Sequence, residues 1–530
     1  MLALFPVLAF LVTTTALPAA QQQQLPFLPS ISPAYQGAIN NQVNPLKHLS
    51  AISPFYIPTQ QPTPLPEGCE LDRVSLLVRH SSILGNDDEY EQTMQPFIAK
   101  IADMDKSKIP EDGEWAFLRD WQTPIVEEKL EQVSEQGKKD AKFLGKYIRK
   151  QYNSLFPPKQ KTSNKTKGGK GKGKGKKQPP YKVWTASSTR DIDTAKAYIL
   201  GGFPSHQSGD GGEGDGDVVQ LVKVPNKARD WDRSLTPHKA CDAFEKQSSL
   251  EPANQWLSVY APRVIDRLKG IMPEVADELI DQDILAMQML CGYETIAQGH
   301  SPFCHLFTDE EWRDVEYYFD VRFHYMMGFG NELSPYLGMP WSKTAKHLLA
   351  GKDTGGNGKH TPNSEGAHED DEVFGSFKKD KLPEPKLPPN ATHTQLLHPS
   401  FTHRESPAFV AVFLNLFNAS THPHPSSEVP PLDHRVDDRA WRTSHLVSFL
   451  GHVALERYHC GGASGHDTPK DGKKHNKVDY VRAVVNGIQE TMSGCEDGLE
   501  GSCKWETFDR WIDERAQRWG DWESVCDKEE

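Results

Sequence analysis

The 530-residue sequence lacks several features that would point to particular classes of protein. It contains no CxxC pair, no nucleotide-binding glycine loop and no recognisable metal-ligand motif. Beyond the first 20 residues, no stretch is apolar enough to span a membrane. Positive charge is also scarce, because 60 Lys and Arg face 73 Asp and Glu, for a net charge of −13. We therefore expect no metal, no cofactor, no membrane partner and no general nucleic-acid partner.

The first 20 residues predict export from the cell. The run LALFPVLAFLV is short for a membrane span and ALPAA offers small residues for cleavage, although no basic region precedes the run. We expect a signal peptide at residues 1–20 and a secreted mature chain. Three N-glycosylation sequons agree with export, and they begin at Asn164, Asn390 and Asn418.

The cysteines favour disulfides over metal binding, because an exported chain holds an even number of them. They are Cys69, Cys241, Cys291, Cys304, Cys460, Cys495, Cys503 and Cys526. The alternative, eight free buried thiols, is disfavoured in an oxidising compartment.

Composition divides the rest of the chain. Residues 21–66 are rich in Gln, Pro and Ser and predict an irregular leader, so one folded unit, 67–530, should begin near Cys69. Three low-complexity inserts interrupt this unit, at 162–179, 206–217 and 351–390. The first holds a basic glycine run that could bind a polyanion, but a solvated surface loop is the favoured interpretation.

Strand-like and helix-like patterns alternate between the inserts. DIDTAKAYILGGF, residues 191–203, has apolar residues at helical spacing. Thr308 and Glu311 form a capping box ahead of a second helix. Ser406 is a candidate N-cap, with Pro407 at the first helical position of a third. These patterns predict a mixed α/β architecture.

Charged side chains follow three of the predicted strands. Arg79-His80 ends the strand in VSLLVRH, Arg190 follows the strand in YKVWTASSTR, and His403-Arg404-Glu405 precedes a helix. Ligands of α/β sheets bind beyond the carboxyl ends of strands, where helix N-termini favour anions. Taken singly, a histidine at a strand end is more often structural and Arg190 could be a surface ion pair. The three stretches together indicate an anion site.

These stretches resemble the histidine acid phosphatase family, in the branch of fungal acid phosphatases and phytases. That family carries Arg-His-Gly-x-Arg-x-Pro after its first strand and a His-Asp or related dipeptide late in the chain. TASSTR, CGYETIAQGHSPFCHLFTDEEW and GFGNELSPYLGMPW also look like the family. The resemblance implies a phosphoglycerate-mutase-like mixed sheet flanked by helices, with a smaller, mainly helical domain from about 91–160 and 220–350.

The resemblance also implies a two-step mechanism. His80 would attack phosphorus and form a phosphohistidine, which water would then hydrolyse. Arg79, Arg190 and His403 would hold the phosphoryl oxygens, and an acid beside His403 would protonate the leaving oxygen. The family's disulfide pairing, carried over, gives Cys69–Cys460, Cys241–Cys526, Cys291–Cys304 and Cys495–Cys503.

The chain departs from the family's motifs at three positions. Ser81 replaces the glycine, Ile83 the second arginine, and Arg404 the aspartate of the late dipeptide. Loss of one arginine clamp would remove about 1.5–3 kcal/mol, or roughly 10- to 100-fold in rate. We hypothesise an exchange, in which Arg404 supplies the missing charge as a phosphate-binding residue and Glu405 becomes the proton donor. The alternative is that Arg404 faces solvent and the site is degenerate.

The sequence therefore predicts a secreted acid phosphomonoesterase that acts on small phosphate esters, with phytate as one candidate substrate. The alternative prediction, from a different class of protein, is a non-catalytic phosphate- or inositol-phosphate-binding protein on the same fold.

Other residues and classes of protein are weaker candidates. Asp87, Asp88 and Glu89 are further candidate acids or ordinary solvated carboxylates. A phosphoglycerate-mutase-like transferase conflicts with the export signal. The motif HDTP at 466–469 ranks below His403, because no helix follows it, and His238 is interpreted as structural.

Overall fold

The computed structural model describes residues 44–56, 62–156, 181–203, 219–226, 234–351, 395–418, 429–461 and 477–527. The predicted signal peptide, the three inserts apart from Gly351, and the HDTP motif lie outside the described residues. Two predicted glycosylation sites, Asn164 and Asn390, lie outside them too. Asn418 is half-buried, and its modification stays a prediction.

The core of the molecule is one mixed sheet in the strand order β3-β2-β4-β1-β5-β6-β7, and β8 pairs with β6. The first four strands of this order run parallel, and the pairs from β1–β5 onward are antiparallel. This confirms the predicted fold class. The strands are β1 (Cys69–Arg79), β2 (Tyr181–Ala186), β3 (Val219–Val224), β4 (Leu397–Thr402), β5 (His452–Cys460), β6 (Val478–Val485), β7 (Ile488–Glu490) and β8 (Cys503–Lys504).

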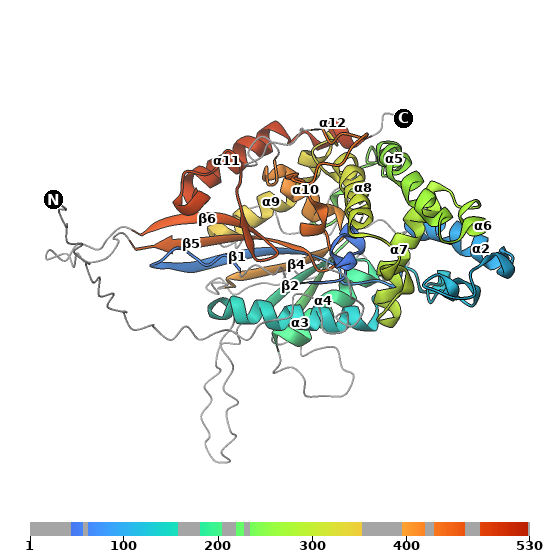
Figure 1. Ribbon diagram of the computed structural model, residues 1–530. Coiled ribbons are helices and arrows are strands. Elements are labelled where there is room, and N and C mark those ends of the chain that lie inside the picture. Colours follow the sequence, from blue (N-terminus) through green and yellow to red (C-terminus); the bar gives the residue numbers. More distant parts are fainter. Residues whose placement is uncertain are drawn as a thin grey trace, which may run out of the picture.

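Helices cover both faces of the sheet (Figure 1). One face carries α3 (Glu135–Gln151) and α4 (Thr189–Gly202), and the other carries α9 (Ser334–Ala350), α10 (Glu405–Phe413) and α11 (Trp505–Arg518). Glycines let these helices approach closely. A Cβ at Gly201 of α4 would lie 1.9 Å from the carbonyl oxygen of Lys142, and one at Gly338 of α9 would lie 2.1 Å from that of Phe409.

A group of helices extends beyond one end of the sheet (Figure 1). It contains α2 (Gln95–Asp103), α5 (Leu250–Lys269), α6 (Pro273–Ala276), α7 (Asp281–Gln298) and α8 (Asp309–Met327), while α1 (Asp87–Glu89) and α12 (Trp522–Cys526) are short. The capping box of Thr308 and Glu311 begins α8 as predicted. A separate helical domain stays a proposal. The ranges expected for it become shorter, because α3 packs on α4 and β3 belongs to the sheet.

Ordered structure begins earlier than the sequence predicts. We expected an irregular leader up to residue 66, but residues 44–56 pack into the core, where Leu49 and Ile52 are fully buried. His48 Nδ1 lies 3.2 Å from Glu316 Oε2 of α8, and the hydroxyls of Ser50 and Thr443 are 2.6 Å apart. A few apolar side chains within NPLKHLSAISPF therefore suffice to bury this segment, despite the polar composition around it.

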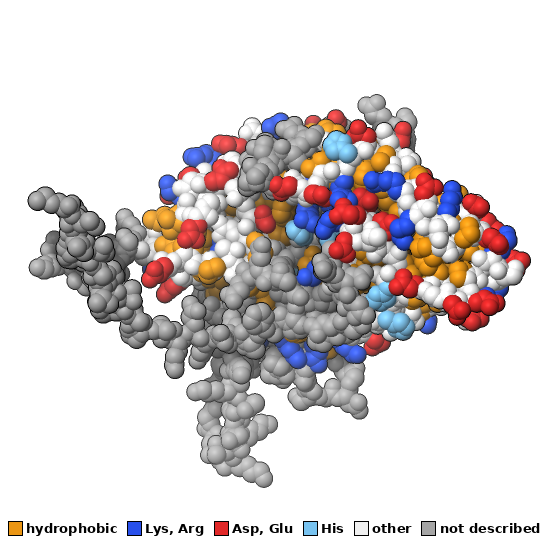
Figure 2. Space-filling view, in the orientation of Figure 1, with side chains coloured by type: hydrophobic (Ala, Val, Ile, Leu, Met, Phe, Trp, Pro, Cys, Tyr) orange, Lys and Arg blue, Asp and Glu red, His pale blue; other side chains and the backbone are white. Residues whose placement is uncertain are grey.

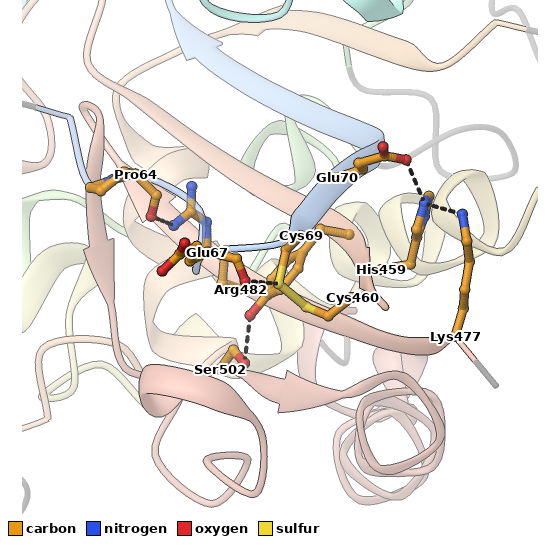
Figure 3. Close-up of a disulfide and its surroundings, with 10 residues drawn as sticks. Pro64, Glu67, Cys69, Glu70, His459, Cys460, Lys477, Arg482 and Ser502 are labelled. Carbon is orange, nitrogen blue, oxygen red and sulfur yellow. Dashed lines mark hydrogen bonds and ion pairs between the residues drawn. A yellow bond between two sulfur atoms is a disulfide. The ribbon is translucent and has the colours of Figure 1, made fainter. Parts of the chain in front are cut away.

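Four disulfides connect the described residues. They join Cys69–Cys460, Cys241–Cys526, Cys291–Cys304 and Cys495–Cys503, the pairs that the resemblance implies. Figure 3 shows the first of these, which ties the start of β1 to the end of β5. Within the described part of the chain, no helix is both long and apolar enough to cross a membrane.

Candidate active site

The parallel strands bring the three predicted stretches to one edge of the sheet. β1 and β4 are neighbours with Arg79 opposite Thr402, and the backbone N–H of His80 donates to the carbonyl of Thr402 at 2.8 Å. β2 lies on the other side of β4 and leads through Ser188 into α4. The rings of His80 and His403 consequently lie next to each other, with centroids 6.3 Å apart and planes nearly perpendicular.

His80 presents one ring nitrogen for chemistry. Its Nδ1 lies 2.9 Å from the carbonyl oxygen of Ser81, which can only accept, so Nδ1 carries the proton and Nε2 has a free lone pair. The ring is buried. Burial lowers the pKa of His80 well below its usual range, and the charges of Arg79 and Arg190 lower it further. The imidazole is therefore neutral, the form that can act as a nucleophile.

Arg79 is fixed by backbone carbonyls rather than by a carboxylate. Its Nη1 donates to Ala51 O at 2.5 Å and to Val447 O at 2.6 Å, and its guanidinium stacks on Phe449 at 4.1 Å. Burial, with the nearby charge of Arg404, lowers the pKa of Arg79 to about 9. The early segment 44–56 thus positions a candidate phosphate ligand, a role that composition could not indicate.

Arg190 lies in the first turn of α4 and forms an ion pair with Glu131. Thr194 of the same helix connects it to the first motif. Its hydroxyl donates to the carbonyl of Arg190 at 2.7 Å and accepts the backbone N–H of Ser81 at 2.9 Å. The Ser81 hydroxyl in turn donates to Gly137 O, so the serine that replaces the family's glycine is a buried structural group.

Ile83, the residue in place of the family's second arginine, is 2% exposed and belongs to the main hydrophobic core. It also forms an isolated antiparallel bridge with Val133. The chain therefore uses this position for packing.

Arg404 is buried and does not face solvent. Its Nη1 donates to Glu89 Oε1 at 2.5 Å, and Glu89 also accepts the hydroxyl of Tyr293 at 2.5 Å. Its guanidinium lies over the ring of Phe323, and its Nη2 has no hydrogen-bond partner among the described residues. Burial raises the pKa of Glu89, but the charges of Arg404 and Arg322, together with the hydrogen bonds from Tyr293 and Arg404, outweigh it and hold the carboxylate ionised. Glu89, one of the acids considered from sequence, is thus the counter-ion of Arg404.

Glu405 begins α10, and Arg404 is its N-cap, so the expected start at Ser406 and Pro407 is wrong by two residues. Ser406 instead donates its hydroxyl to Leu235 O at 2.5 Å, which explains why it does not cap the helix. Glu405 Oε1 lies 3.8 Å from both Lys246 Nζ and Arg404 Nε. Burial raises the pKa of Glu405, but the surrounding positive charge holds it well below its usual range.

Several residues of the site were missed in the sequence. Asp191, fully buried, places Oδ2 2.9 Å from His403 Nε2, and Ser188 Oγ lies 3.0 Å from the same nitrogen. Lys239 and Lys246 add positive charge from the segment that precedes α5. Asp191 and Ser188 flank Arg190 in the sequence, and this adjacency was the available signal.

His238 also belongs to the site, although its sequence suggested a purely structural role. Its Nε2 lies 3.8 Å from Glu405 Oε2, and its ring centroid is 5.6 Å from that of His403. Burial lowers the pKa of His238 to about 3, so the ring is neutral.

The side chains of His238, His403 and Glu405 place donor atoms within 4.8 Å of one another, a spacing compatible with a metal ion. The cations Lys246 and Arg404 approach the same carboxylate, and like charge opposes a divalent cation there. We therefore assign no metal to these side chains. The gathering of Arg79, Arg190, Arg404, Lys239 and Lys246 instead favours a compact anion.

On the surface drawn in Figure 2, Lys and Arg side chains lie among Asp and Glu side chains and form no continuous basic face in the part that the structure describes. Such a mixed surface differs from the basic stripe that nucleic-acid binding requires.

The sequence matches the family model described as histidine phosphatase superfamily (branch 2) over residues 70–486. Phytase A of Aspergillus terreus is 24% identical over 462 residues, which cover 86% of this chain and 85% of that protein. An acid phosphatase of Schizosaccharomyces pombe is 23% identical over 474 residues, covering 86% and 85%. The crystal structure of the phytase from D. castellii has the same fold, with a TM-score of 0.66, 18% identity and coverage of 94% of this chain and 93% of that chain. The chain belongs to the histidine phosphatase superfamily (branch 2).

Proposed function

We propose that the protein is a phosphomonoesterase that hydrolyses phosphate esters through a phosphohistidine on His80. The observation that carries this proposal is a neutral, buried imidazole with a free Nε2, on which the charges of Arg79 and Arg190 act and beside which the ring of His403 lies. Phosphoryl transfer needs a positioned nucleophile and positive charge around the phosphoryl oxygens, and this site offers both.

In the first step, His80 Nε2 forms a bond to phosphorus, and the bond from phosphorus to the ester oxygen breaks. Arg79 and Arg190 hold the phosphoryl oxygens, with Arg404 as a third guanidinium whose Nη2 is unpaired. In the second step, water attacks phosphorus and the phosphorus–nitrogen bond breaks, which releases phosphate. A carboxyl group must protonate the departing oxygen, and Glu405 is the donor that the sequence predicts.

Inositol phosphates are the finer proposal for the substrate class. The relatives include phytases, and a multiple inositol polyphosphate phosphatase from Bifidobacterium longum, solved with inositol hexasulfate, shares the fold with a TM-score of 0.53 at 12% identity. Lys239 and Lys246, which lie close to Glu405, provide charge for a second phosphate group. Secretion is proposed on the signal-like first 20 residues, with four disulfides that suit an oxidising compartment.

The test uses the full chain produced in an exporting host. The protein is assayed on an aryl phosphate and on inositol hexakisphosphate at acid pH, and brief incubation with labelled substrate is followed by acid and base treatment. We expect phosphate release and a protein-bound phosphate that is labile in acid and stable in base. Phosphate release without such an intermediate contradicts the phosphohistidine. Tight binding of inositol hexakisphosphate without any turnover favours the non-catalytic alternative, which the relatives do not favour.

A further inference from the structure

The site contains two buried carboxyl groups whose surroundings differ sharply. Glu405 lies 3.8 Å from each of two cationic side chains, Lys246 and Arg404. Asp191 lies in the first turn of α4, directly after Arg190, and is fully buried. Its Oδ2 is 2.9 Å from His403 Nε2, but neither of its oxygens accepts a hydrogen bond from any of the residues that the structure describes.

An ionised carboxylate in that position is unfavourable. A buried charge is costly without hydrogen-bond donors, and a group that keeps its proton avoids this cost. Burial raises the pKa of Asp191, and the opposing charges of Arg190 and Lys239 offset only part of the rise. Glu405, by contrast, is held ionised by its neighbours. When the pKa values of two carboxyl groups in one site are shifted in opposite directions, the group that keeps its proton is the candidate acid.

We propose that Asp191, rather than Glu405, is the acid that protonates the leaving oxygen. This inference rests on the proposed phosphatase function. The Asp191 proton moves to the ester oxygen as the phosphorus–oxygen bond breaks, which leaves a carboxylate. In the second step that carboxylate takes a proton from the attacking water, so the carboxylic acid is restored when phosphate leaves. Glu405 remains ionised and balances the charge of Lys246 and Arg404.

Contact geometry supports the assignment. His403 is one of the proposed phosphate ligands, so a carboxyl group in contact with its ring lies beside the reacting group. A general acid must come within hydrogen-bond reach of the oxygen in the bound complex, and such contacts tighten only when substrate is present. A phosphoryl dianion would also repel an ionised Asp191, so substrate binding selects the protonated form.

The first experiment compares substrates that differ in leaving group. An alkyl phosphate needs a proton on its departing oxygen, whereas a dinitrophenyl phosphate does not. We expect Asp191→Asn to lower kcat/KM for the alkyl phosphate by about 100-fold or more and to change the dinitrophenyl value little. Glu405→Gln should affect both substrates by the same factor. Asp193→Asn, two residues along α4 and half-buried, is the matched control and should change neither.

Two results would overturn the proposal. One is a leaving-group dependence that appears in Glu405→Gln and not in Asp191→Asn. The other is an equal loss on both substrates in Asp191→Asn, which indicates a positioning role through His403. Asp191→Glu keeps a carboxyl group and should recover part of the alkyl activity if the proton is what matters.

A second readout needs no turnover. Sulfate does not titrate between acid and neutral pH, so its binding reports on the protein alone. The ionisable groups that act on Asp191 are His80, Arg190, Lys239 and Glu405, and His403 is in direct contact. Sulfate should bind wild type more weakly as pH rises and Asp191 ionises, and Asp191→Asn should remove this dependence. An unchanged pH profile in Asp191→Asn contradicts the proposal even if the protein has no phosphatase activity, which separates this failure from failure of the proposed function.

Discussion

The two ends of β1 have opposite characters. At its start, half-buried Cys69 is bonded to Cys460, and exposed Glu70 lies 3.1 Å from His459 (Figure 3). At its other end, Arg79 is buried and held by main-chain carbonyls beside His80. One strand thus has a covalent tie at one end and buried charge at the other. The difference indicates that stability and chemistry can be altered separately by substitutions on the same strand.

The largest expected effect on activity is at the end of β1 that leads into His80. His80→Ala should lower turnover of an aryl phosphate by more than about 1,000-fold, because the nucleophile is removed while the surrounding charges remain. The acid-labile, base-stable phosphate should be missing from this variant, and circular dichroism should show an intact fold. His398→Ala is a matched control, since His398 is also a buried histidine of this sheet, on β4. Undiminished trapping of phosphate on His80→Ala would move the nucleophile elsewhere.

The next effect concerns the exchange between Ile83 and Arg404. Arg404→Ala leaves the buried charge of Glu89 without its arginine partner, so we expect a loss of about 3–5 kcal/mol of folding free energy. It should also raise the inhibition constant of inorganic phosphate by about 10- to 100-fold if Arg404 is a phosphate ligand. Denaturant unfolding and inhibition kinetics measure the two effects.

The double variant Arg404→Met/Glu89→Gln separates the two roles, because it removes both partners of the buried pair. Stability should largely return, while phosphate inhibition should stay weak. Recovery of both properties would mean that Arg404 serves only to neutralise Glu89, and the exchange hypothesis would then fail.

The sequence was sufficient to predict what depends on local pattern. Arg79, Arg190 and His403 follow strands, and the rule that parallel strands end at one edge places them together. It was insufficient for partners that tertiary structure supplies. Arg404 and Glu89 are 315 residues apart, and Arg79 bonds a carbonyl 28 residues earlier in a segment expected to be irregular. Asp191 was overlooked for another reason, since burial and not residue type makes it a candidate acid.

A smaller effect is expected where the early segment meets α8. Glu316 Oε2 lies 3.2 Å from His48 Nδ1 and 2.9 Å from Arg442 Nη2. Burial raises the pKa of Glu316, but the close contact with His48 and the charge of Arg442 lower it well below its usual range. A carboxyl group with a depressed folded-state pKa stabilises the fold above its unfolded pKa of about 4.3, and this contribution is lost as pH falls below that value.

Glu316→Gln should therefore unfold more easily than wild type near neutral pH, by about 1–3 kcal/mol, and the difference should shrink on acidification below pH about 4. Because the same segment carries the Ala51 carbonyl that holds Arg79, KM for an aryl phosphate should rise by a few fold. Urea unfolding at several pH values, with kinetics at one, tests both statements. A stability difference that is constant with pH would show that Glu316 acts through shape and not charge.

The smallest expected effect on activity is at the far end of β1. Cys69→Ser/Cys460→Ser should keep kcat and KM for an aryl phosphate within about twofold of wild type, because the disulfide joins the ends of β1 and β5 that lie away from Arg79 and His80. Its sequence separation is 391 residues, against 8 for Cys495–Cys503. In the chain-entropy model, removing the disulfide that closes the longer loop costs about 6 kcal/mol of stability, and removing the one that closes the shorter loop costs about 2–3 kcal/mol. If Cys69→Ser/Cys460→Ser does not accumulate as folded protein, the variant without Cys495 and Cys503 offers a test with a smaller loss of stability. Thermal unfolding should rank the two, while both keep their activity below the transition. Loss of activity in a folded Cys69→Ser/Cys460→Ser protein would show that the covalent tie also positions the catalytic end, and that the two ends of the strand act as one unit.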